Sequence, residues 1–110
     1  MGAYKLLING QMVDGELSMD VVNPATEEKL ADCPRASESQ LNAAVAAAKA
    51  AFPAWSKTSI DERKAAVLKI ADVVEANAAE LAQLLTKEQG KPIEDATVEV
   101  YGMAAFCRYL

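Results

Sequence analysis

The spacing of hydrophobic residues changes at Ser37, and this change divides the chain into a β-like part and a helical part. Before Ser37, short apolar runs alternate with turn signals such as Asn9-Gly10 and Asn23-Pro24. After Ser37, hydrophobic residues recur every three or four positions. This order predicts an α+β fold, in which a short N-terminal antiparallel β ribbon at about 4–34 precedes four α-helices at about 37–110.

Turn residues define the expected strands. Asn9-Gly10 suits the two positive-φ positions of a type I′ hairpin, and Asp14-Gly15 is a second turn signal. Pro24 fixes its own φ and favours extended geometry at Asn23, so the chain should turn there before the last strand. The expected strands are Tyr4–Ile8, Gln11–Val13, Met19–Val22 and Lys29–Cys33.

Capping signals define where the first two helices begin and end. Ser37 with Gln40, and Ser59 with Glu62, have the spacing of a capping box. Pro53 is expected to close the first helix, and the second should run from Ile60 to about Ala76. One apolar face of the first helix is predicted to consist of Leu41, Val45, Ala48 and Phe52, and one of the second consists of Val67, Ile70, Ala71 and Val74.

The last two helices are defined by a further cap and a Gly-Lys-Pro sequence. Asn77, followed by Glu80, is expected to cap the third helix, and Gly90 should end it in the left-handed conformation. Pro92 suits the first turn of the fourth helix, where its missing N–H group has little cost. The predicted inner face of the fourth helix comprises Ile93, Ala96, Val100, Ala104 and Cys107.

The fourth helix is apolar on nearly all sides from Val100 onward, with Arg108 as its only charged residue. A helix of this kind belongs inside a larger structure. It reaches Leu110 without a Gly, Asn or Pro to stop it, so we expect the chain to break off within this helix.

The charge of the chain excludes some partners. Its 110 residues carry a net charge of -5, and Lys and Arg do not cluster as a nucleic-acid footprint would require. The N-terminus has no basic region followed by a long apolar stretch, and no apolar run is long enough to cross a bilayer. We therefore expect a cytoplasmic protein without nucleic-acid or membrane partners.

The sequence contains no histidine, which excludes a His-assisted nucleophile and the usual imidazole metal sites. Cys33 and Cys107 are expected to be free thiols, and Cys107 has no clear cationic helper besides Arg108 to lower its pKa. Carboxylate pairs such as Glu94-Asp95 fall at turns and helix starts, where negative charge is favoured without any catalytic role. These observations predict no catalytic residue in the chain.

Five motifs follow one another along the chain: Ile8–Gly10, Val13–Gly15, Val22–Thr26, Ala51–Trp55 and Glu88–Pro92. Their order resembles the N-terminal segment of the NAD(P)-dependent aldehyde dehydrogenases. Each motif by itself is common, and the joint order makes the resemblance specific. It covers nearly the whole chain, although Glu27 stands where this family often has Gly, which puts the usual turn geometry in doubt.

The resemblance implies that residues 1–110 are the leading part of the discontinuous cofactor-binding domain of such an enzyme. The family's catalytic Cys, general-base Glu and dinucleotide site lie in sequence beyond residue 110. The implied full-length enzyme oxidises an aldehyde to a carboxylic acid with NAD or NADP and is a homo-oligomer. The 110-residue chain is expected to be non-catalytic, to bind no cofactor and to associate with the remainder of the enzyme chain.

The resemblance also implies two sites with named residues. The backbone carbonyl of Val22 and the carboxylate of Glu88 would help to hold a structural monovalent cation, since such ions prefer hard oxygen ligands. The alternative for Glu88 is a solvated carboxylate at a helix end. Gly102 and Met103 would lie along the substrate channel, and the alternative is that Met103 fills a core.

A second function remains open at this point. The apolar fourth helix could instead serve a stand-alone helical module that binds partner proteins. Sequence that follows residue 110 would discriminate between the two, because a later Cys nucleophile and a Gly-rich segment would support the enzyme.

Overall fold

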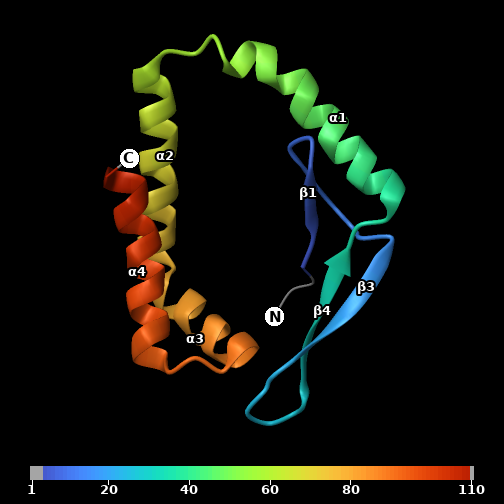
Figure 1. Cartoon of the computed structure of the whole chain (residues 1–110), viewed down its shortest axis with the longest axis vertical. Coiled ribbons are helices and arrows are strands. Elements are labelled where there is room, and N and C mark those ends of the chain that lie inside the picture. The colour runs from blue at the N-terminus through green and yellow to red at the C-terminus, as the bar shows by residue number, and fades with distance from the viewer. Residues whose placement is uncertain (1–3, 110) are drawn as a thin grey trace. The chain divides into compact units, whose positions relative to one another are not determined.

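The computed structural model describes residues 4–109, which form two antiparallel β ribbons and four helices (Figure 1). Leu110, where the fourth helix was expected to break off, lies outside the described residues. The α+β class and the order of the elements are confirmed. The elements are β1 Leu6–Ile8, β2 Gln11–Val13, β3 Leu17–Val22, β4 Lys29–Arg35, α1 Glu38–Trp55, α2 Ile60–Ala76, α3 Ala78–Gln89 and α4 Ile93–Tyr109.

The chain divides into two compact units. The first contains the strands and α1, and the second contains α2, α3, α4 and the loop Asn23–Glu28. Since that loop joins β3 to β4 but belongs to the helical unit, the chain passes between the units three times. Among the described residues, no helix is sufficiently long and apolar to cross a membrane.

The first ribbon is the predicted hairpin. β1 pairs antiparallel with β2 in a register that sets Leu6 opposite Val13 and Ile8 opposite Gln11. Asn9 and Gly10 connect the strands with φ angles of 52° and 73°. Both central positions therefore have the positive φ that a type I′ turn requires, and the prediction for Asn9-Gly10 is confirmed.

The second ribbon is separate from the first, whereas the sequence pattern predicted a single ribbon. β3 pairs antiparallel with β4, with Met19 opposite Cys33, and both strands are longer than predicted. A Cβ atom at Gly15 would lie 2.8 Å from the backbone nitrogen of Arg35. Gly15 is therefore required by the close approach of two backbones rather than by a left-handed turn.

Helix α1 begins at its predicted capping box. The Ser37 N–H group donates to Gln40 Oε1 at 3.2 Å, and the Gln40 N–H group donates to Ser37 Oγ at 3.2 Å. The Gln40 side chain also accepts from the N–H group of Glu16 and donates to the carbonyl of Asp14. One amide thus caps the helix and fastens it to the segment between β2 and β3.

The expectation that Pro53 closes α1 is wrong, because the helix continues to Trp55. Pro53 removes only its own N–H group, and the next donors still bond, as Ser56 N–H does to the carbonyl of Phe52 at 2.8 Å. The predicted apolar face is uncovered, since Leu41 and Phe52 are 57% and 64% exposed. The half-buried residues near the middle of α1 are Ala44 and Ala47 instead.

Helix α2 begins at the predicted box of Ser59 and Glu62, which bond to each other's backbone. The N–H group of Ser59 lowers the pKa of the Glu62 carboxyl. Asn77, in contrast, does not cap α3: its side chain donates to the carbonyl of Val73 at 2.8 Å. Asn77 is the only residue between the two helices, and its φ of -113° and ψ of 14° are not the extended geometry of an N-cap, so it ends α2 instead.

The last two helices meet as the Gly-Lys-Pro sequence predicts. Gly90 ends α3 with a φ of 82°, and its N–H group donates to the carbonyl of Thr86 at 2.8 Å. Pro92 directly precedes α4, and its carbonyl accepts from the N–H group of Ala96 at 2.9 Å. Gly90 therefore ends α3, and Pro92 directly precedes the first residue of α4.

The core of the helical unit is made of small side chains. α4 packs against α2 and α3, and α2 and α4 run side by side in Figure 1. Among the described residues, seven side chains are buried, and all of them are Ala or Val. They are Ala71, Val74, Ala78, Ala82, Ala96, Val100 and Ala104, with Leu85 and Cys107 packed against them.

Candidate functional site

The loop Asn23–Glu28 is held by its own hydrogen bonds. The side-chain oxygen of Asn23 accepts from the N–H group of Ala25. The backbone carbonyl of Asn23 accepts from the N–H group of Glu27. Glu27 has a φ of 61°, a left-handed conformation that favours glycine. The doubt about the turn raised by Glu27 is thereby resolved: Glu27 adopts a glycine-like conformation without being a glycine.

The Asn-Pro motif meets the Gly-Lys-Pro motif within the helical unit. A Cβ atom at Gly90 would lie 3.0 Å from Pro24 Cγ, tighter than ordinary van der Waals contact. Gly90 is therefore required both by its positive φ and by the ring of Pro24. The contact gives a physical reason for two motifs far apart in the sequence to occur together.

The two residues of the expected cation site lie in different units. Val22 ends β3 next to an irregularity in the ribbon between Val21 and Val22, and Glu88 is exposed in the last turn of α3. In the sequence, Val22 lies two residues before Pro24, and Glu88 lies two residues before Gly90, the two residues that approach each other. Among residues 4–109, no group of three or more Cys, Asp or Glu side chains could hold a metal ion. A cation here would therefore need backbone oxygen.

Gly102 and Met103 line the same groove on the helical unit, which has a volume of about 540 Å³. A Cβ atom at Gly102 would meet nothing within 4 Å, and Met103 is 53% exposed. Within residues 4–109, Met103 therefore lies at the surface. The other lining residues are Val67, Glu99, Phe106 and Cys107.

A second hollow adjoins this groove toward α3. Leu81, Leu84 and Leu85 form its apolar floor, and Glu88 and Glu99 contribute carboxylates to its lining. Glu99 forms an ion pair with Lys91, which precedes α4. Glu88 thus lies beside an apolar hollow, an environment that its motif did not indicate.

Arg108 joins α4 to α2 through two carboxylates. Its guanidinium lies 2.8 Å from Asp72 and 2.6 Å from Glu75. Hydrogen bonding from Arg108 lowers the pKa of the Glu75 carboxyl, so this residue remains ionised under mildly acidic conditions. This link was not predicted from the sequence. Its signal was that Arg108 is the only charged residue in an apolar helix end, where a cation needs a partner of opposite charge.

The chain matches the model of the aldehyde dehydrogenase family over residues 12–110. It is 42% identical over 106 residues to a probable aldehyde dehydrogenase of a Pseudomonas species, covering 96% of this chain and 22% of that protein. It is 41% identical over 101 residues to the malonate-semialdehyde dehydrogenase of Pseudomonas aeruginosa, covering 91% of this chain and 20% of that protein.

A solved structure has a similar fold. The crystal structure of PnpE in complex with nicotinamide adenine dinucleotide superposes with a TM-score of 0.91 at 39% identity, covering 98% of this chain and 23% of that one. The chain therefore spans about a fifth of the length of the relatives that it matches. Because the family model matches nearly the whole chain, from residue 12 to residue 110, the chain belongs to the aldehyde dehydrogenase family.

Proposed function

We propose that this chain is the leading part of the cofactor-binding domain of an NAD(P)-dependent aldehyde dehydrogenase. The observation that carries the proposal is the family match over residues 12–110, which favours an enzyme over a stand-alone interaction module. The complete enzyme would be cytoplasmic and homo-oligomeric. Its catalytic Cys and general-base Glu would come from sequence outside these 110 residues, and NAD or NADP would accept hydride from the substrate. This chain would support the cofactor domain.

The substrate of the complete enzyme would be a semialdehyde. The support is that one of the similar proteins is a malonate-semialdehyde dehydrogenase, and the family resemblance of Glu-Gln-Gly-Lys-Pro at residues 88–92 leans slightly the same way. A panel of aldehydes with and without a distal carboxylate would test this substrate class on the complete gene product. Preference for the carboxylate-free aldehydes would contradict it.

The purified 110-residue chain should not reduce NAD or NADP in the presence of any aldehyde, because it supplies none of the reacting groups. The complete gene product should do so, and absorbance of the reduced nicotinamide measures both rates. The matched control is the complete protein with its expected nucleophilic Cys replaced by Ala. Turnover by the pure 110-residue chain, or its absence from the complete protein, would contradict the proposed function.

We also propose that Glu88 and the carbonyl of Val22 contribute to a structural Na⁺ or K⁺ site in the complete enzyme, with other oxygens from later sequence. The support is that both adjoin the joint formed by Pro24 and Gly90. Sodium chloride should raise the melting temperature above that in choline chloride of equal ionic strength. Glu88→Gln should abolish this difference, whereas Glu80→Gln in the first turn of α3 should retain it.

Gly102 and Met103 would form part of the substrate-channel wall in the complete enzyme. The support is their position in an open apolar groove. Met103→Ala should change kcat/KM by roughly tenfold for a bulky aldehyde and less for a small one, as expected for apolar contact in a pocket. Val98→Ala is the control, because Val98 is 72% exposed on α4 and does not line the groove. Equal effects of the two variants would refute the channel role.

A further inference from the structure

The turn between β1 and β2 contains an asparagine followed by a glycine, a pair of residues that can react with each other. Asn9 and Gly10 are exposed, and a Cβ atom at Gly10 would meet nothing within 4 Å. The flanking residues Ile8 and Gln11 are paired, so they exchange the ladder hydrogen bonds and the Gly10 N–H group takes no part in them. The backbone nitrogen of Gly10 is therefore a free nucleophile beside the Asn9 side-chain amide.

Attack of this nitrogen on the Asn9 side chain closes a five-membered succinimide ring. The Gly10 nitrogen loses its proton and bonds to Asn9 Cγ, the bond from Cγ to Nδ2 breaks, and the amide nitrogen leaves as ammonia. Water then opens the ring at one of its two carbonyl carbons. Opening at Cγ leaves aspartate, and opening at the backbone carbonyl carbon leaves isoaspartate. One water is consumed, one ammonia is released, and the side-chain NH2 is replaced by OH.

The closed turn holds the two reacting atoms apart. Asn9 has a φ of 52° and Gly10 a φ of 73°, as in a type I′ turn, whose first central residue has a ψ of about 30°. At this ψ, the Gly10 nitrogen and the Asn9 side chain lie on opposite sides of the bond from Cα to the carbonyl carbon. Ring closure requires both on the same side, so the turn must open before the reaction begins.

The hairpin that closes this turn is small. β1 and β2 have three residues each, and a two-stranded hairpin of this size is only marginally stable by itself. Lys5, which precedes β1, forms an ion pair with Asp14, which follows β2, so this pair joins the two ends of the hairpin. Its side chains are 38% and 83% exposed, and water therefore screens their attraction. The turn at the upper end of β1 in Figure 1 should open often.

The other three asparagines of the chain lack this combination of features. Asn23 precedes a proline, whose nitrogen carries no hydrogen and cannot attack. Asn42 lies inside α1, where the following N–H group is held in the helical ladder. The Asn77 side chain donates to the carbonyl of Val73 at 2.8 Å. Asn9 therefore has the reactive geometry within reach, and the other three serve as internal controls.

We propose that Asn9 is a site of spontaneous deamidation and that opening of the β1–β2 hairpin sets its rate. The aspartate product suits the same turn, since Asp-Gly also favours type I′. The isoaspartate product adds a methylene group to the backbone, so the loop can no longer set Ile8 opposite Gln11. The isoaspartate form should therefore have an open hairpin. This inference goes beyond the proposed function, since every reacting atom belongs to residues 9 and 10 or to water.

Peptide mapping of the aged 110-residue chain tests the site. The chain is kept in mildly alkaline buffer, and mass spectrometry follows the replacement of NH2 by OH at each asparagine. Asn9 should be modified before Asn23, Asn42 and Asn77, and guanidinium chloride should raise its rate roughly tenfold because the hairpin is then open throughout. An unmodified Asn9 would overturn the site. Equal rates with and without denaturant would overturn the control by the hairpin.

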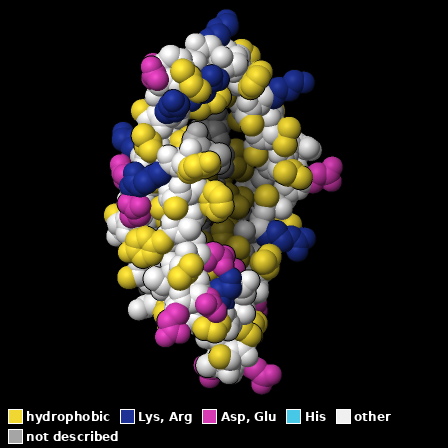
Figure 2. Space-filling view, turned by 60° about the vertical axis from the view of Figure 1, so that its left-hand side comes forward, with side chains coloured by type: hydrophobic (Ala, Val, Ile, Leu, Met, Phe, Trp, Pro, Cys, Tyr) yellow, Lys and Arg dark blue, Asp and Glu magenta, His cyan; other side chains and the backbone are white. Residues whose placement is uncertain are grey.

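Protein concentration should not change the rate, because the reaction occurs within one chain. This check is needed because hydrophobic side chains are exposed across the face shown in Figure 2, where chains in contact would alter the rate. A rate that depends on protein concentration would overturn a reaction confined to residues 9 and 10.

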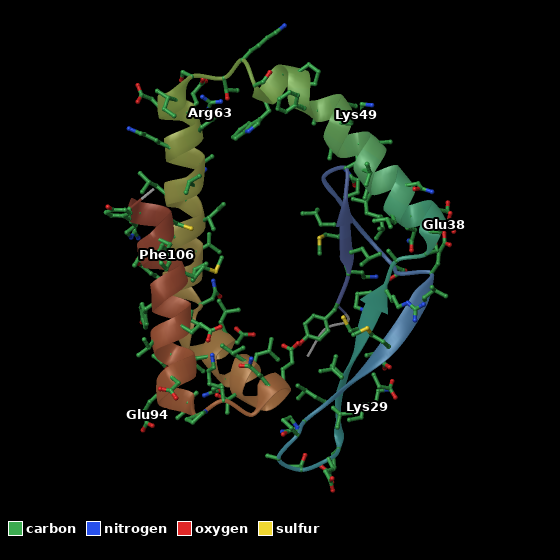
Figure 3. The ribbon with its side chains drawn as sticks, viewed as in Figure 1. Lys29, Glu38, Lys49, Arg63, Glu94 and Phe106 are labelled. Carbon is green, nitrogen blue, oxygen red and sulfur yellow. The ribbon has the colours of Figure 1, made fainter. Side chains whose placement is uncertain are left out.

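The ion pair at the ends of the hairpin tests opening as the step that sets the rate. Lys5→Gln removes the partner of Asp14 and should raise the rate of deamidation about twofold. Lys49→Gln removes the same charge from an exposed position on α1 (Figure 3) and should leave the rate unchanged. Equal rates for the two variants would overturn hairpin opening as the controlling step.

The isoaspartate form tests the effect on the hairpin. Chromatography separates the two products, and Asn9→Asp is the matched control, because it has the composition and charge of the isoaspartate form with a normal backbone. Amide hydrogen exchange at Ile8 and Gln11 should be roughly tenfold faster in the isoaspartate form than in Asn9→Asp. Equal exchange would overturn the opening of the hairpin. Activity of the complete enzyme is a separate readout, so failure here leaves the proposed function intact.

Discussion

Ala104→Leu is expected to lower the free energy of unfolding of the helical unit by about 2–3 kcal/mol, because a larger side chain has no room there. Ala104, Ala96 and Ala71 are all 0% exposed, and α4 packs directly against α2. The added carbon atoms must separate the helices or adopt an unfavourable rotamer. A unit with so small a core has little stability to lose.

Urea titration followed by circular dichroism measures this effect. Val98→Leu is the matched control, since it enlarges a side chain on the same helix at a position that is 72% exposed. The control should shift the free energy of unfolding by less than about 0.5 kcal/mol. An Ala104→Leu midpoint equal to that of the parent would show that α2 and α4 are not closely packed through their alanines. Both proteins are measured at the same protein concentration.

Gly90→Ala is expected to destabilise the chain by about 2 kcal/mol, from two sources at one position. The φ of 82° costs a non-glycine residue about 1–2 kcal/mol. In addition, the new Cβ atom would lie 3.0 Å from Pro24 Cγ, so the loop Asn23–Glu28 must shift by a few tenths of an ångström. The contact between Pro24 and residue 90 should therefore become weaker.

Two comparisons separate these sources. Gly102→Ala adds a Cβ atom to open space in a helix and should stabilise the chain by about 0.5–1 kcal/mol. Pro24→Ala removes the obstructing ring, so a double-mutant cycle with Gly90→Ala should show a coupling of about 0.5 kcal/mol or more. Additive effects would mean that the Pro24 contact does not contribute and that only the φ of Gly90 matters.

Local chemistry made the helix starts and the hairpin predictable. Ser37, Ser59 and Asn9-Gly10 each satisfy or shape the backbone within a few residues, so sequence spacing contains the needed information. Asn77 and Pro53 were misread because their outcome depends on the neighbouring turn. The Asn77 side chain donates to the carbonyl of Val73 in the preceding turn, and the Ser56 N–H group beyond Pro53 still donates to the carbonyl of Phe52.

Long-range features could not be predicted in this way. The crowding of Gly15 by Arg35, the contact of Gly90 with Pro24 and the link from Arg108 to Glu75 all join segments distant in the sequence. The division of the strands into two ribbons is of the same kind. The sequence also could not show that Val67 of α2 lines one groove with Met103 and Phe106 of α4, because periodicity shows that a helix face is apolar but not which helix packs beside it.

The alanine contact between α2 and α4 has a consequence for where conformational freedom is lost. Alanine has no side-chain rotamers to restrict, so bringing these helices together costs almost no side-chain entropy. Met103, Phe106 and Ile60 lie outside that contact and retain most of their rotamers. These three side chains lose their conformational entropy only when another surface covers them. The flexible thioether of Met103 can then adjust its shape to that surface.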